Sequence, residues 1–195
     1  LELGIIDVRE NKYDEAIRRF EEGILASPAF ASNYFRAAQL YFASENHKIW
    51  ALVYGEAEAL LAPGQAHRQA EMAAGIRDTW MSALTFENRS DSVSAKVSFV
   101  PSRQVMLDTT GGTSYLGFDG VFEGCAVVAA QKLVGQIHPF IGSIEQLTAL
   151  RGGILETYFE LTDNLYGNSM YLFPFQKSVM EAGHWEAYNY YLFRN

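Results

Sequence analysis

The residues best suited to metal binding or proton transfer in this 195-residue chain are its histidines and its single cysteine. They are His47, His67, His138, His184 and Cys125. No histidine stands at metal-ligand spacing from another histidine or from the cysteine. One cysteine can form neither an internal disulfide nor a thiolate cluster. We therefore expect no metal and no cofactor, and mainly structural roles for these side chains.

One exception lies near the C-terminus, where His184 and Glu186 could exchange protons near neutral pH. With Trp185 and Tyr188 they form a candidate site for a small ligand or an enzymatic reaction. The competing interpretation is that a terminal aromatic helix closes the end of a helical stack, with His184 at its cap. The chain has no Walker loop, no dinucleotide fingerprint and no His-Glu-x-x-His motif. The sequence therefore favours a non-catalytic protein over an enzyme.

Composition limits the possible partners. Hydrophobic residues make up 49% of the chain and charged residues 19%, which is typical of a folded protein. The net charge of −8 opposes nucleic-acid binding. No apolar run is longer than that from Cys125 to Ala130, which is far shorter than the roughly 20 residues of a membrane helix, so we expect a soluble protein without membrane insertion. The chain begins at Leu1 without Met, so an upstream signal peptide or further repeats could have been removed, and cytoplasm and periplasm both stay open.

The stretch from Leu3 to Pro28 predicts a helical hairpin. Two patterns of apolar residues spaced three and four apart are joined by a short polar break at residues 10–12. Gly4 and Ala16 should let the two helices approach closely, while Tyr13 and Phe20 fill the remaining groove. A lone hairpin buries too little apolar surface to fold, so further helices must stack on it.

This pattern resembles the tetratricopeptide repeat. The matching residues are Leu3, Gly4, Tyr13, Ala16, Phe20 and Pro28. Two positions depart from the family: Asp7 stands where it usually has an aromatic residue, and Gly23 where it usually has alanine. The C-terminal half is similar to uncharacterised bacterial proteins of this kind that end in a Gly-His-aromatic-Glu-Ala-Tyr-Asn-Tyr tail. The resemblance implies an all-α protein built from hairpins in an α-α superhelix.

A second unit follows, with Ala37, Ala38 and Tyr41 at the expected places and a closing Ala62-Pro63. Its second helix, residues 48–61, has two possible registers, because Pro28 and Pro63 are one residue further apart than the family period of 34. In the register that we favour, the extra residue lies at the end and Tyr54 matches Phe20. In the other, it lies in the turn at residues 44–47, and Gly55 takes that place.

The rest of the chain predicts a cap helix and a C-terminal half. Residues 65–86 carry apolar side chains four apart, as in one amphipathic helix. Apolar and polar residues alternate at positions 93–99, and with a return strand at 104–107 they favour a small β-hairpin insertion.

Helices are expected at 118–134, from 144 to about 164, at 170–182 and from Trp185. Ser143 and Gln146 form a capping box, and Gly183 has the character of a helix C′ residue. The expected regions are 1–86 (repeats and cap helix), 87–117 (linker or hairpin) and 118–195 (helical region packing on the repeats).

By its geometry, the family implies a concave groove that binds a protein or a peptide. The implied groove residues are Ile5, Val8, Arg9, Ser32, Phe35, Gln39 and Phe42. Phe35 and Gln39 stand where the family's clamp for terminal carboxylates needs Lys and Asn, so an apolar or amphipathic helix is the better expected partner. The competing interpretation is that the phenylalanines pack against the cap helix. Self-association through the aromatic C-terminus is a further possibility.

Overall fold

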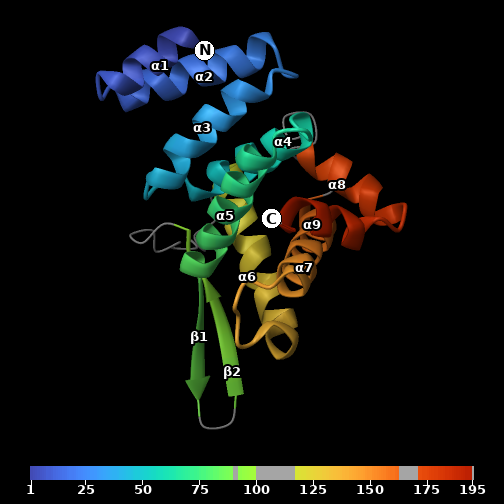
Figure 1. The fold of residues 1–195 in the computed structure, drawn as a ribbon. Helices are drawn as coiled ribbons and strands as arrows, with labels where there is room; N and C mark the ends of the chain where they lie inside the picture. Colours follow the sequence, from blue (N-terminus) through green and yellow to red (C-terminus); the bar gives the residue numbers. More distant parts are fainter. Residues whose placement is uncertain (90–91, 100–116, 163–170, 195) are drawn as a thin grey trace. The chain divides into compact units, whose positions relative to one another are not determined.

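The computed structural model describes residues 1–89, 92–99, 117–162 and 171–194. In these ranges the chain forms nine helices and one antiparallel pair of strands (Figure 1). The expected class, all-α with a small β-hairpin, is confirmed. The chain divides into two compact units, residues 1–79 with 192–195 and residues 80–191. None of the helices in the described ranges has both the length and the apolar character that crossing a membrane requires.

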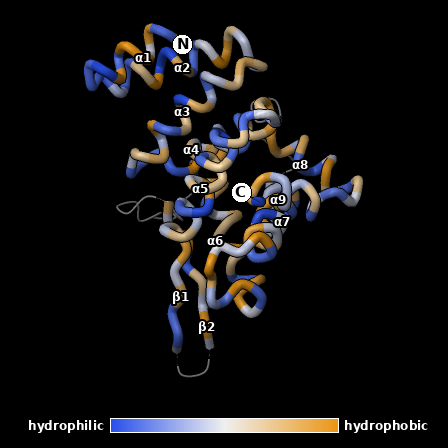
Figure 2. Tube along the Cα trace, in the orientation of Figure 1, coloured by the Kyte–Doolittle hydropathy of each residue, from blue (hydrophilic) through white to orange (hydrophobic). Residues whose placement is uncertain are grey.

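The first unit begins with two helical hairpins, as the sequence predicts. Its helices are α1 (Glu2–Arg9), α2 (Tyr13–Ala26), α3 (Ala31–Ala43), α4 (Lys48–Leu61) and the first part of α5 (Ala66–Ala83). Helix α1 packs against α2, α2 against α3, and α3 against α4. Hydrophobic and hydrophilic residues alternate along α1 and α2 in Figure 2, as amphipathic helices require. Met72 of α5 joins Phe35 and Ala38 of α3 in a buried cluster, so α5 covers the second hairpin.

The close approach of α1 to α2 depends on Gly4. A Cβ atom at Gly4 would lie 2.5 Å from Cε1 of Phe20, whose side chain is fully buried together with Ala16 and Ala37. The roles expected of Gly4, Ala16 and Phe20 are confirmed. Tyr13 was expected in the same interface, and this is wrong: half of its surface is exposed, and its hydroxyl donates a 2.9 Å hydrogen bond to Asn11 Oδ1. The Phe20 ring already fills the space at Gly4, and Tyr13 starts α2 at the solvent side.

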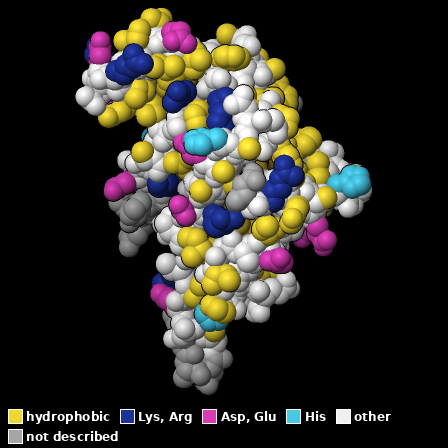
Figure 3. Space-filling model, in the orientation of Figure 1, with side chains coloured by type: hydrophobic (Ala, Val, Ile, Leu, Met, Phe, Trp, Pro, Cys, Tyr) yellow, Lys and Arg dark blue, Asp and Glu magenta, His cyan; other side chains and the backbone are white. Residues whose placement is uncertain are grey.

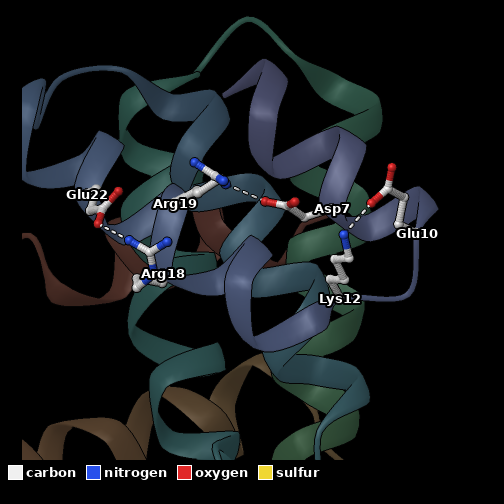
Figure 4. A network of polar contacts seen from close by, with 6 residues as sticks. All are labelled: Asp7, Glu10, Lys12, Arg18, Arg19 and Glu22. Carbon is white, nitrogen blue, oxygen red and sulfur yellow. Dashed lines mark hydrogen bonds and ion pairs between the residues drawn. The ribbon is translucent and has the colours of Figure 1, made fainter.

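The two departures from the repeat pattern have partners in the structure. Asp7 is buried and pairs with Arg19 of α2, next to the exposed pairs Lys12–Glu10 and Arg18–Glu22 (Figure 4). The ion pair joins α1 to α2 through a charge-assisted hydrogen bond. At Gly23, a Cβ atom would lie 2.5 Å from Nδ2 of the buried Asn33. The absence of a side chain at Gly23 therefore allows α3 to approach α2 closely.

The favoured register of α4 is wrong. Residues 10–12 separate α1 from α2, whereas residues 44–47 separate α3 from α4, so the extra residue lies in the turn. Ala51, which is fully buried, takes the place of Ala16, and Gly55 takes that of Phe20. The missing aromatic volume comes from α3 instead: a Cβ atom at Gly55 would lie 3.1 Å from Cζ of Phe42.

The second unit contains the hairpin. Strand β1 (Leu84–Arg89) pairs antiparallel with β2 (Ser92–Val97), and Leu84 lies opposite Val97. The prediction of helix as far as residue 86 is wrong, since α5 ends at Ala83 and the buried Leu84, Ala95 and Val97 belong to the sheet instead. The pairing of β1 with β2 satisfies the backbone groups that a longer helix would have bonded internally. The expected return strand at 104–107 lies outside the described residues.

Four helices complete this unit: α6 (Phe118–Ile137), α7 (Ile144–Thr162), α8 (Leu172–Glu181) and α9 (Trp185–Phe193), whose last residues belong to the first unit. Strand β2 and α7 both pack on α6. The predicted capping box starts α7: Gln146 N–H donates to Ser143 Oγ at 3.3 Å, and Ser143 N–H donates to Gln146 Oε1 at 3.4 Å. Gly183 ends α8 with φ +75°, and the amides of Gly183 and His184 bond the carbonyls of Met180 and Val179. This confirmed Schellman motif sets the direction of α9.

Candidate functional site

A cavity of about 300 Å³ lies between the first helices of the two hairpins. We call it the N-terminal groove. It is lined by Ile5, Val8 and Arg9 of α1, Phe20 of α2, and Arg36, Gln39 and Leu40 of α3. Its apolar residues are also part of the unit's core, because Ile5, Val8 and Leu40 pack on buried Ala16, Phe20 and Ala37. The groove therefore has a floor fixed by core packing rather than by surface side chains.

Two guanidinium groups line the groove. Arg36 donates a 3.0 Å hydrogen bond to Gln39 Oε1, and Gln39 in turn donates to Glu71 Oε1 at 2.6 Å. Among the ion pairs of the described residues, none involves Arg9 or Arg36. In a protein of net charge −8, the groove is thus a local cationic site with an apolar floor. Figure 3 shows hydrophobic side chains over much of the α1–α2 hairpin, with Lys and Arg side chains among them.

The structure divides the expected groove residues into two groups. Ile5, Val8, Arg9 and Gln39 line the N-terminal groove. The others are Ser32, Phe35 and Phe42, and they belong to the packing of α3 against α4 and α5. Phe35 is 8% exposed and lies under the guanidinium of Arg68 at 4.2 Å, and the Arg68 Nη1 atom is 3.5 Å from Ser32 Oγ.

Phe42 is held between two glycines. Cβ atoms at Gly55 of α4 and Gly75 of α5 would lie 3.1 and 2.7 Å from its ring. The competing interpretation, packing against the helix after the second hairpin, therefore describes Phe35 and Phe42. Sequence reasoning missed Phe20, Arg36 and Leu40 as lining residues. Arg36, Gln39 and Leu40 are spaced three and four apart, which would have placed them on one face of α3.

Arg68 also meets a buried carboxylate. Glu58 of α4 is fully buried, and its Oε1 atom lies 3.1 Å from Arg68 Nε. Burial raises the pKa of the Glu58 carboxyl above its usual value, and the charge of Arg68 opposes this shift. The pair lies in the α4–α5 interface and contributes no side chain to the N-terminal groove.

A larger cavity of about 880 Å³ lies within the second unit, and we call it the α7–α9 cleft. Its lining comes from the C-terminal part of α6 and from α7, α8 and α9: Leu133, Gln136, Ile144, Glu145, Thr148, Ala149, Gly152, Gly153, Glu156, Met180, Trp185, Glu186, Ala187 and Tyr190. Trp185 is fixed in its wall, because its Nε1 donates a 3.0 Å hydrogen bond to the Thr148 carbonyl. Gly152 makes this possible, since a Cβ atom there would lie 3.0 Å from the same nitrogen.

The alternative site residues are only partly brought together. Trp185 and Glu186 line the α7–α9 cleft. Tyr188 is buried, with the guanidinium of Arg151 5.7 Å from its ring. His184 is exposed and starts α9 after the Schellman turn, outside the residues that line the cleft. The cleft thus has aromatic and carboxylate groups in its wall, and the proposed proton exchange of His184 with Glu186 gains no support from it.

The remaining chemistry of the described residues gives no second kind of site. They contain no group of three or more His, Cys, Asp or Glu side chains that could hold a metal ion. Cys125 is 1% exposed, and burial raises the pKa of its thiol to about 11, so it is a poor nucleophile at neutral pH. No protein family, curated protein or solved structure matches the chain.

Proposed function

We propose that the first unit is a non-catalytic peptide-binding module of tetratricopeptide-like hairpins. In this proposal, its N-terminal groove holds an apolar segment that carries carboxylates. The observation that carries the proposal is the presence, in one cavity, of an apolar floor and two guanidinium groups without an ion pair. The repeat assignment is supported by the Gly4–Phe20 contact and by the successive packing of α1 to α4.

The size of the groove limits what it holds. Small-molecule sites usually have volumes of about 300–1,000 Å³ and enclose most of the ligand. At about 300 Å³, the groove has room for one or two side chains of a peptide, with the backbone lying across Ile5 and Leu40. An amphipathic helix presents such side chains at positions i and i+4, and a carboxylate one turn away would reach Arg9 or Arg36.

Arginine suits this task because its planar guanidinium can bond both oxygens of a carboxylate. Arg36 is held by its bond to Gln39, which reduces the entropy lost when a ligand binds. Arg9 is exposed at the end of α1, next to the apolar floor residues Ile5 and Val8. The two arginines beside the apolar floor discriminate against basic peptides, because a Lys or Arg of such a peptide would lie next to a guanidinium of the same charge.

Fluorescence anisotropy with two designed helical peptides tests the proposal. Both carry leucines at i and i+4, and one has glutamates where the other has lysines. We expect the acidic peptide to bind, and Arg36→Gln or Arg9→Gln to weaken it about fivefold, as an exposed charge pair of about 1 kcal/mol requires. Arg18→Gln is the matched control, because Arg18 is exposed, lies outside the groove and pairs with Glu22. Equal binding of both peptides, or no effect of either groove variant, would refute the proposal.

A second candidate function is ligand binding in the C-terminal half. The observation in its favour is the α7–α9 cleft, to which Trp185 and Glu186 contribute side chains. It does not depend on the N-terminal groove, since no residue lines both cavities.

A further inference from the structure

The charges around the α7–α9 cleft are all of one sign. Glu145, Glu156 and Glu186 line it, whereas no Lys or Arg does. All three carboxylates are exposed, and none of them takes part in an ion pair among the described residues. A ligand that enters the cleft therefore meets three carboxylates that no Lys or Arg of the described residues neutralises.

The nearby cations of the same unit have other partners. Lys132 pairs with Glu160 at 3.6 Å, and Lys177 pairs with Glu181 at 3.8 Å. Arg151 is buried beneath the wall, bonded to the side chain of Asn189 and 5.2 Å from the ring of Trp185. The cleft is thus anionic at its surface, and the guanidinium of Arg151 lies behind the wall, held by the Asn189 amide and the Trp185 ring.

The spacing of the carboxylates selects the shape of the ligand. Glu145 and Glu156 are 11 residues apart on α7, close to three full turns, so they lie on one face and about 16 Å apart along the helix. One ammonium group cannot reach both carboxylates across this distance. An extended peptide with basic residues at positions i and i+6 can, because side chains an even number of residues apart project from one face. Six residues of extended chain span about 20 Å, and flexible Lys or Arg side chains accommodate the small difference.

The rest of the lining favours a peptide over a simple polyamine. Between the carboxylates the wall is apolar and aromatic, formed by Ile144, Ala149, Met180, Trp185 and Tyr190. Such a wall stabilises apolar side chains, which a polyamine lacks. A cavity of about 880 Å³ also exceeds what a linear polyamine fills. The wall is ordered before binding, since Trp185 is bonded to Thr148 and the Asn189 side chain bonds the Trp185 carbonyl at 2.8 Å.

We propose that the α7–α9 cleft binds an extended basic peptide segment of a partner protein. Its Lys or Arg side chains pair with Glu145, Glu156 and Glu186, and its intervening apolar side chains pack against Trp185 and Tyr190. This inference concerns the second unit alone and does not rest on the function proposed for the first.

Anisotropy with a rhodamine-labelled peptide of sequence Lys-Ser-Leu-Ser-Phe-Ser-Lys, whose Lys, Leu and Phe side chains share one face of the extended chain, tests the inference on the full protein. We expect saturable binding that weakens with added salt, and we expect replacement of both lysines by glutamate to abolish it. The double variant Glu156→Gln with Glu186→Gln should weaken binding about tenfold. The matched control is Glu15→Gln with Glu45→Gln, which removes the same charge from exposed carboxylates outside the cleft that are in none of the ion pairs of the described residues, and it should change binding less than twofold.

A third variant separates site binding from general attraction. Ala187 is exposed in the cleft wall, so Ala187→Lys adds a cation there without disturbing the core, and it should weaken peptide binding. Equal losses in the two double variants would overturn the inference, because attraction would then follow net charge alone. Displacement of the peptide by an equal concentration of spermidine would also overturn it, in favour of a small polycation. Binding of the peptide in which glutamates replace both lysines would also contradict the inference.

Discussion

Gly75 of α5 lies where any side chain would overlap with Phe42 of α3. A Cβ atom there would be 2.7, 2.8 and 2.9 Å from three carbons of the Phe42 ring. Real Cβ contacts of this length do not occur, so the ring or the helix must move. The same ring also lies close to α4, since a Cβ atom added at Gly55 would be 3.1 Å from its Cζ, so little free space adjoins it there. We therefore expect Gly75→Ala to destabilise the first unit, although alanine is the better helix former.

The magnitude follows from two opposing terms. Overpacking of this kind lowers the free energy of unfolding by about 1–3 kcal/mol, whereas exchanging glycine for alanine inside a helix raises it by about 1 kcal/mol. The net loss should be about 1 kcal/mol. In the background of Phe42→Ala the clash is absent, so Gly75→Ala should instead stabilise by about 1 kcal/mol. The two sites should thus show a coupling free energy of about 1–3 kcal/mol in a double-mutant cycle.

Urea unfolding followed by circular dichroism measures these free energies. Gly124→Ala in α6 is the matched control, because Gly124 also lies inside a helix but has no atom within 4 Å of an added Cβ. The control should be stabilised by about 1 kcal/mol. If Gly75→Ala stabilises as much as Gly124→Ala does, and shows no coupling to Phe42, the packing described for α3 and α5 is wrong.

Two further predictions concern buried titratable groups. Burial raises the pKa of Glu58, so the folded state holds this proton more tightly than the unfolded state does. The free energy of unfolding should therefore increase as the pH falls from neutral toward the usual glutamate pKa. Glu58→Gln should remove that part of the pH dependence, measured as the difference between parent and variant in urea titrations. A variant with an unchanged slope would show that Glu58 does not titrate differently in the fold. The Cys125 thiol, with its pKa raised to about 11, should react with a disulfide reagent at pH 8 at least 100-fold more slowly in the folded protein than in urea, and comparable rates would contradict its burial.

Several features of the fold could be predicted because their signals are local. Gly4 and Phe20 are brought together by a hairpin of two short helices, and the pairing of their sizes is visible in the sequence. The capping box of Ser143 and Gln146 spans three residues, and the left-handed Gly183 needs only its own backbone. Each of these predictions rests on contacts within about 20 residues of chain.

The failures occur where a distant segment decides the outcome. Phe42 fits the implied groove by position, yet its ring goes to Gly55 and Gly75, and nothing in α3 alone shows that both partners are glycine. The register of α4 failed for the same reason, because Phe42 supplies the volume that an aromatic at position 55 would have supplied. Leu84 matches the helical pattern of α5 but joins the sheet, since it pairs with Val97 of the antiparallel strand β2.

The same limit applies to the candidate sites. The N-terminal groove needs α1 and α3 at a fixed separation, which Gly4 and Gly23 set through contacts with Phe20 and Asn33. The sequence could name Ile5 and Val8 from their family positions, but it could not show that Arg36 joins them. In the α7–α9 cleft, the approach of Trp185 to Gly152 joins residues 33 positions apart, and no local pattern indicates it.

The opposite charges of the two cavities make the binding tests unequal in strength. A protein of net charge −8 attracts cationic probes and repels anionic ones at long range, wherever they bind. Binding of a basic peptide could therefore arise without any site, and only the comparison of Glu156 and Glu186 with the control carboxylates Glu15 and Glu45 assigns it to the cleft. Binding of an acidic peptide must overcome this repulsion. A positive result there requires a local cationic site, and Arg9 and Arg36 are the guanidinium groups that the N-terminal groove supplies.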